Sequence, residues 1–203
     1  MHRLRRAGIA SGIALAAALA AAPAAVAGDI ECRGSLTGAV AGNVIVPDDA
    51  VCTLSGTVID GSITVKSRAT LDAEGIETTG GIQAESPLHI LVQQSKIGNN
   101  LSVAKAGEPV LRRPSDSHIR LLQNQIKGDI ALKESESTMD VAGNTTGGSI
   151  QVEKNRGPID ISGNMIGNQI QCQDNSPPPT GSGNSARQYG NQCPAPLFGT
   201  TRP

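Results

Sequence analysis

The amino-acid sequence predicts an all-β protein: a single-stranded, right-handed parallel β-helix with three sides and about seven rungs of 19–20 residues. A rung is one complete turn of the chain around the helix axis. Three observations support this prediction. Aliphatic residues recur at a constant spacing, apolar residues alternate with polar ones within short segments, and asparagines recur in the same register.

The repeat is clearest where a small-residue turn precedes an aliphatic residue, as in GNVIV, GSITV and GSIQV. These aliphatic positions are spaced 19, 19, 19, 29, 20 and 20 residues apart, so the period is constant apart from one ten-residue insertion. A constant period of this length is typical of a solenoid. The positions are Val44, Ile63, Ile82, Leu101, Ile130, Ile150 and Ile170.

Two further columns of inward residues keep the same register. The second column is Cys52, Leu71, Ile90, Ile119, Met139 and Ile159, and the third is Val40, Ile59, Thr78, Ile97, Ile126, Thr146 and Ile166. Each rung therefore holds three short segments with period-two alternation, which indicates strands with one face inward. Three strands in about 20 residues predict a triangular solenoid whose rungs stack ~4.8 Å apart.

Asparagine predicts how one corner of the solenoid is stabilised. Asn124, Asn144, Asn164 and Asn184 recur every 20 residues. Such a column can bond its side-chain amides along the stack and satisfy the bent backbone. Four independent turn asparagines are the alternative. An asparagine ladder and unequal rungs of this length are typical of right-handed parallel β-helices.

The ends of the chain predict export. Residues 1–27 begin with the basic stretch MHRLRR, continue with a short Ala-rich apolar stretch and end in AVA, which is the pattern of a secretory signal peptide. The β-helix domain is expected over residues 28–193, followed by a tail at 194–203. We expect the mature chain to be secreted, either extracellular or periplasmic, with no transmembrane segment.

The charge of the mature chain argues against nucleic acid as a partner. The whole sequence has 17 basic and 18 acidic residues. Cleavage of the predicted signal peptide removes Arg3, Arg5 and Arg6, which leaves a net charge of 14 − 18 = −4. A mildly acidic chain lacks the basic surface that nucleic-acid binding needs. Cell-envelope components or glycans are the partners that we expect instead.

Four cysteines in an exported chain indicate two disulfides, because that compartment is oxidising. Three pairings are formally open. The spacing favours two local loops, Cys32–Cys52 and Cys172–Cys193, one at each end of the solenoid. Open solenoid ends expose unpaired backbone and core, so they need caps. Self-association through these ends is the other outcome that the architecture allows.

The last rung departs from the repeat. Pro179 and Gly181 replace two inward aliphatics, and the three consecutive prolines cannot donate to a strand ladder. A three-residue insertion follows, after which Cys193 is expected to lie above Ile170. From there it would close the broken rung onto Cys172 beneath it.

The tail GNQIQCQDNSPPPTGSGN…GNQC, with the repeats before it, resembles uncharacterised exported bacterial parallel β-helix proteins with a cysteine-closed C-terminus. The resemblance covers most of the mature chain and implies no defined activity. The short GxI rungs also resemble bactofilins, which are polymer-forming cytoskeletal β-helix proteins. The leader and the cysteines depart from the bactofilin pattern.

One outward face carries candidate ligand-binding residues. Its column includes two carboxylates and an arginine, and the insertion at 104–118 leads into it with further basic and acidic groups. Together these groups could bind calcium or an acidic sugar, as in pectate-lyase-like β-helices. In the alternative interpretation, the arginine neutralises the carboxylates and the insertion is a surface loop. The candidate residues are Arg112, Arg113, Asp116, His118, Arg120, Asp140 and Asp160.

These features predict a non-catalytic exported β-solenoid that acts as a rigid cell-envelope or extracellular structural module. No catalytic residue, metal site or cofactor is assigned. The alternative is a small pectate-lyase-like protein that acts on or binds polysaccharide through the insertion face, and only this alternative would involve calcium.

Overall fold

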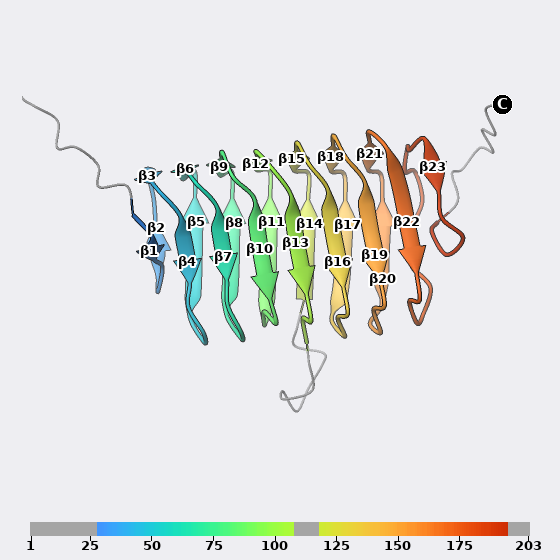
Figure 1. Ribbon diagram of the computed structural model, residues 1–203, viewed down its shortest axis with the longest axis horizontal. Coiled ribbons are helices and arrows are strands. Elements are labelled where there is room, and N and C mark those ends of the chain that lie inside the picture. The colour runs from blue at the N-terminus through green and yellow to red at the C-terminus, as the bar shows by residue number, and fades with distance from the viewer. Residues whose placement is uncertain (1–27, 108–117, 195–203) are drawn as a thin grey trace, which may run out of the picture.

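The computed structural model describes residues 28–107 and 118–194, and this part of the chain contains 23 β-strands and no helix. All strand pairs are parallel, and the strands form three sheets that run the length of the molecule (Figure 1). We name them sheets A, B and C in the order in which each rung visits them.

Sheet A has nine strands, and sheets B and C have seven each. Sheet A contains β1 (Ile30–Glu31), β4 (Val44–Val46), β7 (Ile63–Val65), β10 (Ile82–Glu85), β13 (Leu101–Ala104), β16 (Ile130–Lys133), β19 (Ile150–Glu153), β22 (Gln169–Gln173) and β23 (Gln188–Tyr189). Sheet B contains β2 (Ser35–Leu36), β5 (Val51–Ser55), β8 (Thr70–Glu74), β11 (His89–Gln93), β14 (His118–Leu122), β17 (Thr138–Ala142) and β20 (Ile159–Ser162). Sheet C contains β3 (Ala39–Ala41), β6 (Val58–Asp60), β9 (Glu77–Thr78), β12 (Lys96–Ile97), β15 (Gln125–Ile126), β18 (Thr145–Thr146) and β21 (Met165–Ile166).

The solenoid is right-handed and three-sided, as predicted. In Figure 1 the strands of sheet A run downward at the front, those of sheet B run upward behind them, and the chain advances from left to right. This path is a right-handed coil. It makes about eight turns, slightly more than the seven expected, because β1 and β23 add partial turns at the two ends.

Strand pairing confirms the register of the predicted columns. Ile150 pairs with Ile130 on one side and with Ile170 on the other, and the equivalent pairs continue along sheet A. The columns predicted for sheets B and C are paired in the same way. Ile150 is fully buried, whereas its neighbour Gln151 is partly exposed. The core is therefore a set of aliphatic columns in which each residue contacts its counterparts in the rung before and the rung after.

A single left-handed residue turns the chain at the corner between sheets A and B. Lys105, Glu134, Lys154 and Asp174 occupy this corner in successive rungs, with φ of 53°, 53°, 55° and 55°. One residue of this conformation reverses the local direction of the backbone within a short connection. The corners therefore repeat as regularly as the strands do.

The structure shows that the insertion is shorter than the predicted range 104–118. Ala104 still belongs to β13 and His118 already begins β14. Between them, Ala106 is buried and its N–H donates to the hydroxyl of Ser135, 3.0 Å away in the next rung. The ten additional residues are therefore 108–117, which lie outside the described part together with three candidate residues, Arg112, Arg113 and Asp116.

We expect deletion of residues 108–117 to leave the fold intact. The deletion joins Gly107 to His118 and leaves a two-residue connection, Ala106–Gly107, the same length as Pro87–Leu88 one rung earlier. Shortening a loop in this way changes the closure entropy by less than ~1 kcal/mol. Circular dichroism and thermal unfolding should therefore resemble those of the parent chain.

A ten-residue deletion of 128–137 is the control, because it removes all of β16 and should prevent cooperative folding. Loss of the β-sheet signal on deletion of 108–117 would show that these residues belong to the solenoid.

Candidate functional site

The described candidate residues lie together on the outward face of sheet B. Arg120 on β14, Asp140 on β17 and Asp160 on β20 are paired in register on three neighbouring strands. His118 lies two residues before Arg120 on β14. The backbone thus places these four side chains on one face.

The polar side chains of this face contact residues on the same strand or on the neighbouring strand. Arg120 Nε lies 3.5 Å from Asp140 Oδ2, and the two side chains are 46% and 45% exposed. The carboxylate of Asp160 instead accepts a hydrogen bond from the hydroxyl of Ser162 in its own strand. An exposed ion pair of this kind contributes at most ~1 kcal/mol to stability. Arg120 therefore neutralises Asp140, and Asp160 has its own partner.

A histidine that the sequence analysis passed over lies beside His118. His89 on β11 pairs in register with His118, and the two ring centroids are 6.5 Å apart. His89 Nε2 also lies 3.7 Å from Asp72 Oδ1. Burial lowers the pKa of His89 below its ordinary value, Asp72 opposes that shift, and His118 and Arg120 lower the pKa further. The 29-residue spacing of the two histidines equals the column spacing across the insertion and could have identified the pair.

Within residues 28–107 and 118–194, no three His, Cys, Asp or Glu side chains converge closely enough to hold a metal ion as they stand. An open groove of about 390 Å³ on sheet C is lined by residues that include Glu77, Lys96 and Lys127, and a smaller one of about 270 Å³ lies on sheet A beside Asn100. The candidate face of sheet B thus carries charged groups that do not converge on one point.

The asparagine column forms a continuous hydrogen-bonded ladder at the corner between sheets B and C. Asn144 Oδ1 accepts from both the backbone N–H and the side-chain Nδ2 of Asn124, each at 3.0 Å. Asn144 Nδ2 then donates to Asn164 Oδ1 at 3.0 Å and to the carbonyl of Leu121 at 2.7 Å. Asn164 repeats the pattern with Asn184. The amides of Asn124, Asn144 and Asn164 are thereby satisfied by the rungs on either side, and Asn184 ends the column with its Nδ2 donating to the carbonyl of Ile161.

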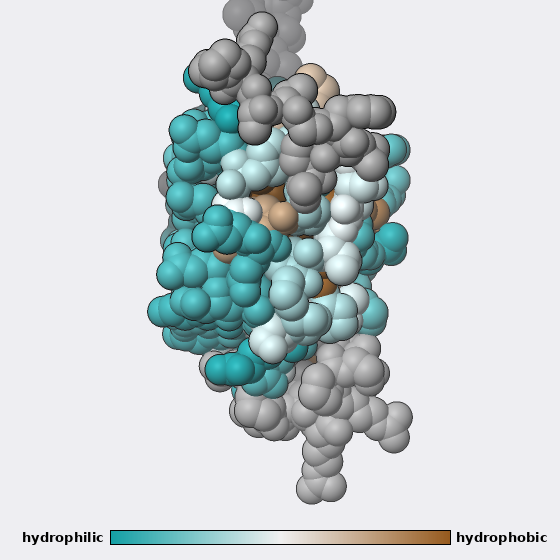
Figure 2. All heavy atoms as spheres, turned by 90° about the vertical axis from the view of Figure 1, so that its right-hand side faces the viewer, coloured by the Kyte–Doolittle hydropathy of each residue, from teal (hydrophilic) through white to brown (hydrophobic). Residues whose placement is uncertain are grey.

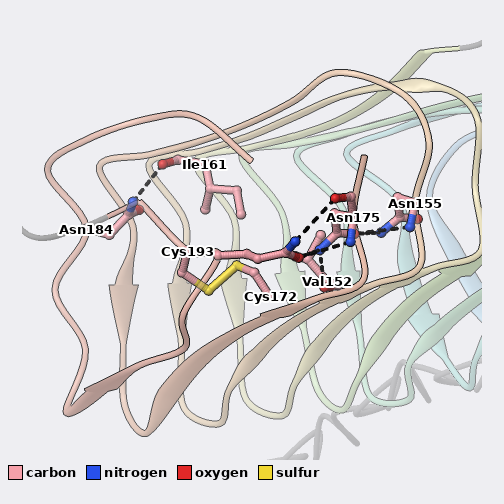
Figure 3. Close-up of a disulfide and its surroundings, with 8 residues drawn as sticks. Val152, Asn155, Ile161, Cys172, Asn175, Asn184 and Cys193 are labelled. Atoms are coloured by element: carbon pink, nitrogen blue, oxygen red, sulfur yellow. Dashed lines mark hydrogen bonds between the residues drawn. A yellow bond between two sulfur atoms is a disulfide. The ribbon is translucent and has the colours of Figure 1, made fainter. Parts of the chain in front are cut away.

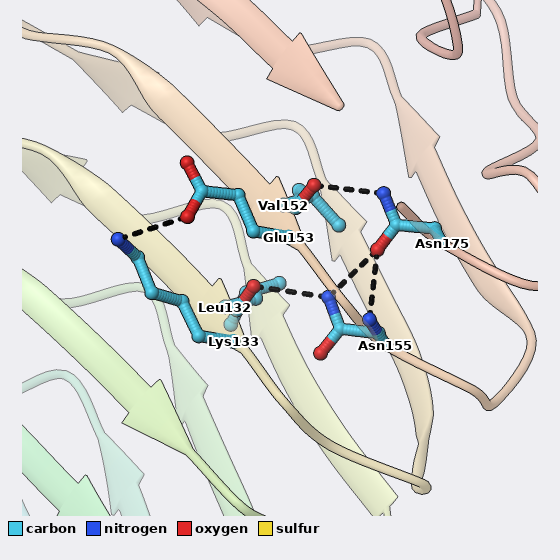
Figure 4. A network of polar contacts seen from close by, with 6 residues as sticks. All are labelled: Leu132, Lys133, Val152, Glu153, Asn155 and Asn175. Atoms are coloured by element: carbon cyan, nitrogen blue, oxygen red, sulfur yellow. Dashed lines mark hydrogen bonds and ion pairs between the residues drawn. The ribbon is translucent and has the colours of Figure 1, made fainter. Parts of the chain in front are cut away.

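A second ladder, which the sequence analysis missed, occupies the corner between sheets A and B. Asn155 Nδ2 donates to Asn175 Oδ1 and to the carbonyl of Leu132, both at 3.0 Å. Asn175 Nδ2 donates to the carbonyl of Val152 at 2.7 Å (Figure 4). Ser135 donates its N–H to Asn155 Oδ1. Ser135, Asn155 and Asn175 are 20 residues apart, which is the signal that could have revealed them.

The last coil completes this second ladder. Gln192 Oε1 accepts the N–H of Asn175 at 3.0 Å, and Gln192 Nε2 donates back to the Asn175 carbonyl at 3.4 Å. Beside it, Cys193 forms the disulfide with Cys172, with their Cα atoms 5.1 Å apart (Figure 3). The C-terminal end is therefore closed by a covalent bond and by an amide that ends the ladder.

The predicted position of Cys193 was wrong. Tyr189, not Cys193, pairs with Ile170 in sheet A, and Cys193 reaches Cys172 from the turn that follows β23. The Tyr189 hydroxyl donates to the carbonyl of Asn184 at 2.8 Å. The tyrosine thus continues the aliphatic column of sheet A with its ring and bonds the last coil with its hydroxyl.

The surface at this end agrees with a closed cap. Figure 2 looks at the C-terminal end, where hydrophilic residues form much of the outline and residues of intermediate hydropathy cover most of the centre, with small apolar areas between them. At the opposite end, Cys32 is bonded to Cys52 on β5, with their Cα atoms 5.5 Å apart. Each disulfide therefore joins the terminal coil to its neighbour.

Comparisons with protein-family models, with curated proteins and with solved structures found no match to this chain. Among the described residues, no helix is long and apolar enough to cross a membrane.

We expect Asn164→Ala to destabilise the protein by at least ~2 kcal/mol. The substitution leaves the Asn144 N–H and the Val141 carbonyl without the side-chain partner that they have now, and each buried group left unsatisfied costs ~1–3 kcal/mol. Chemical denaturation monitored by circular dichroism measures the change.

Asn168→Ala is the matched control, because Asn168 is exposed and only four residues away. Its effect should stay within ~0.5 kcal/mol. Equal losses for the two variants would show that the ladder contributes no special stability.

Proposed function

We propose that the protein is an exported, non-catalytic structural module that presents rigid β-sheet faces in the cell envelope or outside the cell. The observation that carries this proposal is the closure of both solenoid ends by disulfides, Cys32–Cys52 and Cys172–Cys193. The described residues contain no free cysteine.

Two independent features support export. Disulfides persist in oxidising compartments and are rare in reducing ones. Residues 1–27 lie outside the described part, but their basic start, apolar stretch and small-residue end match a secretory signal peptide. We propose that cleavage leaves a mature chain that begins near Gly28. The resemblance to exported parallel β-helix proteins points the same way.

Rigidity follows from the way in which the rungs are joined. Each rung pairs with its neighbours in three sheets, and from Asn124 onward two buried side-chain ladders add further bonds along the axis. Among the described residues, no buried side-chain nitrogen or oxygen lacks a hydrogen-bond partner. Solenoid stability is a sum of repeat terms and nearest-neighbour interface terms, so each bond along the axis strengthens the interface between the two rungs that it joins.

A polysaccharide-binding or polysaccharide-cleaving protein is the second candidate. The observation that favours it is the gathering of His118, Arg120, Asp140 and Asp160 on one face, where the insertion rejoins the solenoid. A lyase of the pectate type would need a base and a calcium site among such groups. The Arg120–Asp140 ion pair supports the structural proposal instead, because it already uses both charges.

Sedimentation with isolated cell-envelope fragments separates the two proposals. We expect the mature oxidised protein to co-sediment with the fragments, and Asp140→Ala and Arg120→Ala to bind equally well, since the ion pair is not the contact. Incubation with acidic polysaccharide and calcium should release no unsaturated product.

Protein that stays in the supernatant would count against an envelope module. Release of unsaturated product that Asp140→Ala abolishes would establish the polysaccharide-active alternative.

A further inference from the structure

We propose that two copies of this chain associate side by side, through the outward face of sheet C, as a weak antiparallel dimer. The contact is made by a face of the solenoid and not by its capped ends. This inference does not depend on the structural role proposed above.

One column of exposed residues runs along this face. Its members are paired in register on six consecutive strands, from β6 to β21, and all six side chains are exposed. Figure 1 places sheet C along the top of the molecule, away from the corner where the described chain stops at Gly107 and resumes at His118. In chain order the column is Val58, Glu77, Lys96, Gln125, Thr145 and Met165.

The two ends of the column are apolar. Val58 and Met165 are 52% and 63% exposed, and Met165 is the most exposed large hydrophobic side chain in the described part of the chain. Five rung spacings of ~4.8 Å separate the two residues, which is about 24 Å along the axis. They therefore form two separate apolar contact points with polar residues between them.

A two-fold axis brings these two points together. In an isologous dimer, a residue that contacts a second residue on the other copy is matched by the reciprocal contact. If the axis crosses the face midway between Lys96 and Gln125 and runs parallel to the strands, Val58 of one copy lies opposite Met165 of the other. Both exposed hydrophobic side chains of each copy are then covered, and every rung of the column has a counterpart.

The same axis gives each charged side chain a neutral polar counterpart. Lys96 lies opposite Gln125, whose amide oxygen can accept a hydrogen bond from the ammonium group. Glu77 lies opposite Thr145, whose hydroxyl can donate to the carboxylate. No like charges face each other along the column in this arrangement.

The charges of the column oppose the other registers. A parallel arrangement would place Glu77 against Glu77 and Lys96 against Lys96. An antiparallel arrangement shifted by one rung brings either Lys96 against Lys96 or Glu77 against Met165. Contact between like charges and burial of an unpaired carboxylate both oppose association. A shift of two rungs can pair Glu77 with Lys96, but it leaves Met165 of both copies in water.

A groove at the centre of the face keeps the charged groups hydrated. The open groove of about 390 Å³ spans the strands on both sides of the axis, and Glu77, Lys96 and Gln125 are among the residues that line it. Glu77 Oε2 lies 3.5 Å from Lys96 Nζ, so each copy already holds this ion pair. In the dimer the two grooves face each other and leave room for water, so the ion pair keeps its solvent. The apolar contacts at the two ends therefore supply the attraction.

The narrow face makes the dimer weak. The strands of sheet C are two or three residues long, so the interface is smaller than the ~800 Å² that each partner buries in a stable complex. We expect a dissociation constant between ~1 µM and ~1 mM.

Cross-linking between introduced cysteines tests the orientation. All four native cysteines are in disulfides, so a short bismaleimide reacts with introduced thiols alone. The double variant Val58→Cys/Met165→Cys of the oxidised mature chain should form covalent dimers. Each single variant should remain monomeric, because at least ~24 Å separates like positions in the antiparallel dimer.

The matched control is Thr64→Cys/Gln171→Cys, which spans the same five rung spacings on the outward face of sheet A. This pair should give no covalent dimer. Cross-linking of the control pair to the same extent, or covalent dimers from either single variant, would overturn the proposal.

Sedimentation velocity at increasing protein concentration provides a second measurement. Val58→Asp and Met165→Asp should each weaken dimerisation at least ~10-fold, because each places a carboxylate against an apolar side chain. Gln171→Asp should leave dimerisation unchanged, and circular dichroism should verify that every variant keeps the solenoid. A parent chain that stays monomeric at ~1 mM, or equal dimerisation of the parent chain and Met165→Asp, would also overturn the proposal.

Discussion

Parallel stacking in register is the constraint on which the rest of this structure depends. Each residue lies directly over the residue one rung earlier, so the side chain at any position must be compatible with its partners in the adjacent rungs ~4.8 Å away. Aliphatic side chains satisfy this rule by packing in columns, as Ile130, Ile150 and Ile170 do. Charged side chains satisfy it where neighbours have opposite sign, as in Lys133 and Glu153, whose Nζ and Oε2 lie 3.2 Å apart. Asp140 and Asp160 are the contrary case, since these like charges are paired in register and Asp160 bonds to Ser162 instead.

The same rule explains why asparagine occupies the buried corners. A buried corner leaves backbone N–H and C=O groups unpaired, and each costs free energy unless it finds a partner. The asparagine amide both accepts and donates, so it can serve the backbone and the next asparagine at once. Serine takes this position in earlier rungs, where Ser95 Oγ accepts the N–H of Ile76 at 3.1 Å. The ladders therefore extend a simpler serine contact into a continuous network.

The columns of the core could be predicted because their members are alike and equally spaced. The second ladder could not be recognised as readily, because its positions hold Ser135, Asn155, Asn175 and finally Gln192, which arrives after an irregular coil. The position of Cys193 was misjudged for the same reason. An insertion in a coil without strands has no periodicity from which to count, so only the packing shows that Tyr189 continues the column.

The candidate face on sheet B could likewise be predicted only in part. Period and alternation alone predicted that Arg120, Asp140 and Asp160 would stack, and the strand pairs place them so. The partners of their side chains could not be predicted, because each depends on a rotamer choice at an exposed position. Asp160 bonds to Ser162 rather than to its neighbours, and His89 leans toward Asp72.

The free energy of unfolding of Ile150→Asp, compared with that of Gln151→Asp, tests in-register stacking most directly. Ile150 is fully buried between its partners, and an unpaired buried carboxylate costs several kcal/mol. Gln151 projects outward, so the same substitution there should cost at most ~0.5 kcal/mol. The pair Ile130 and Ala131, one rung earlier, should show the same contrast. Comparable losses at Ile150 and Gln151 would contradict the alternation and, with it, the stacked solenoid.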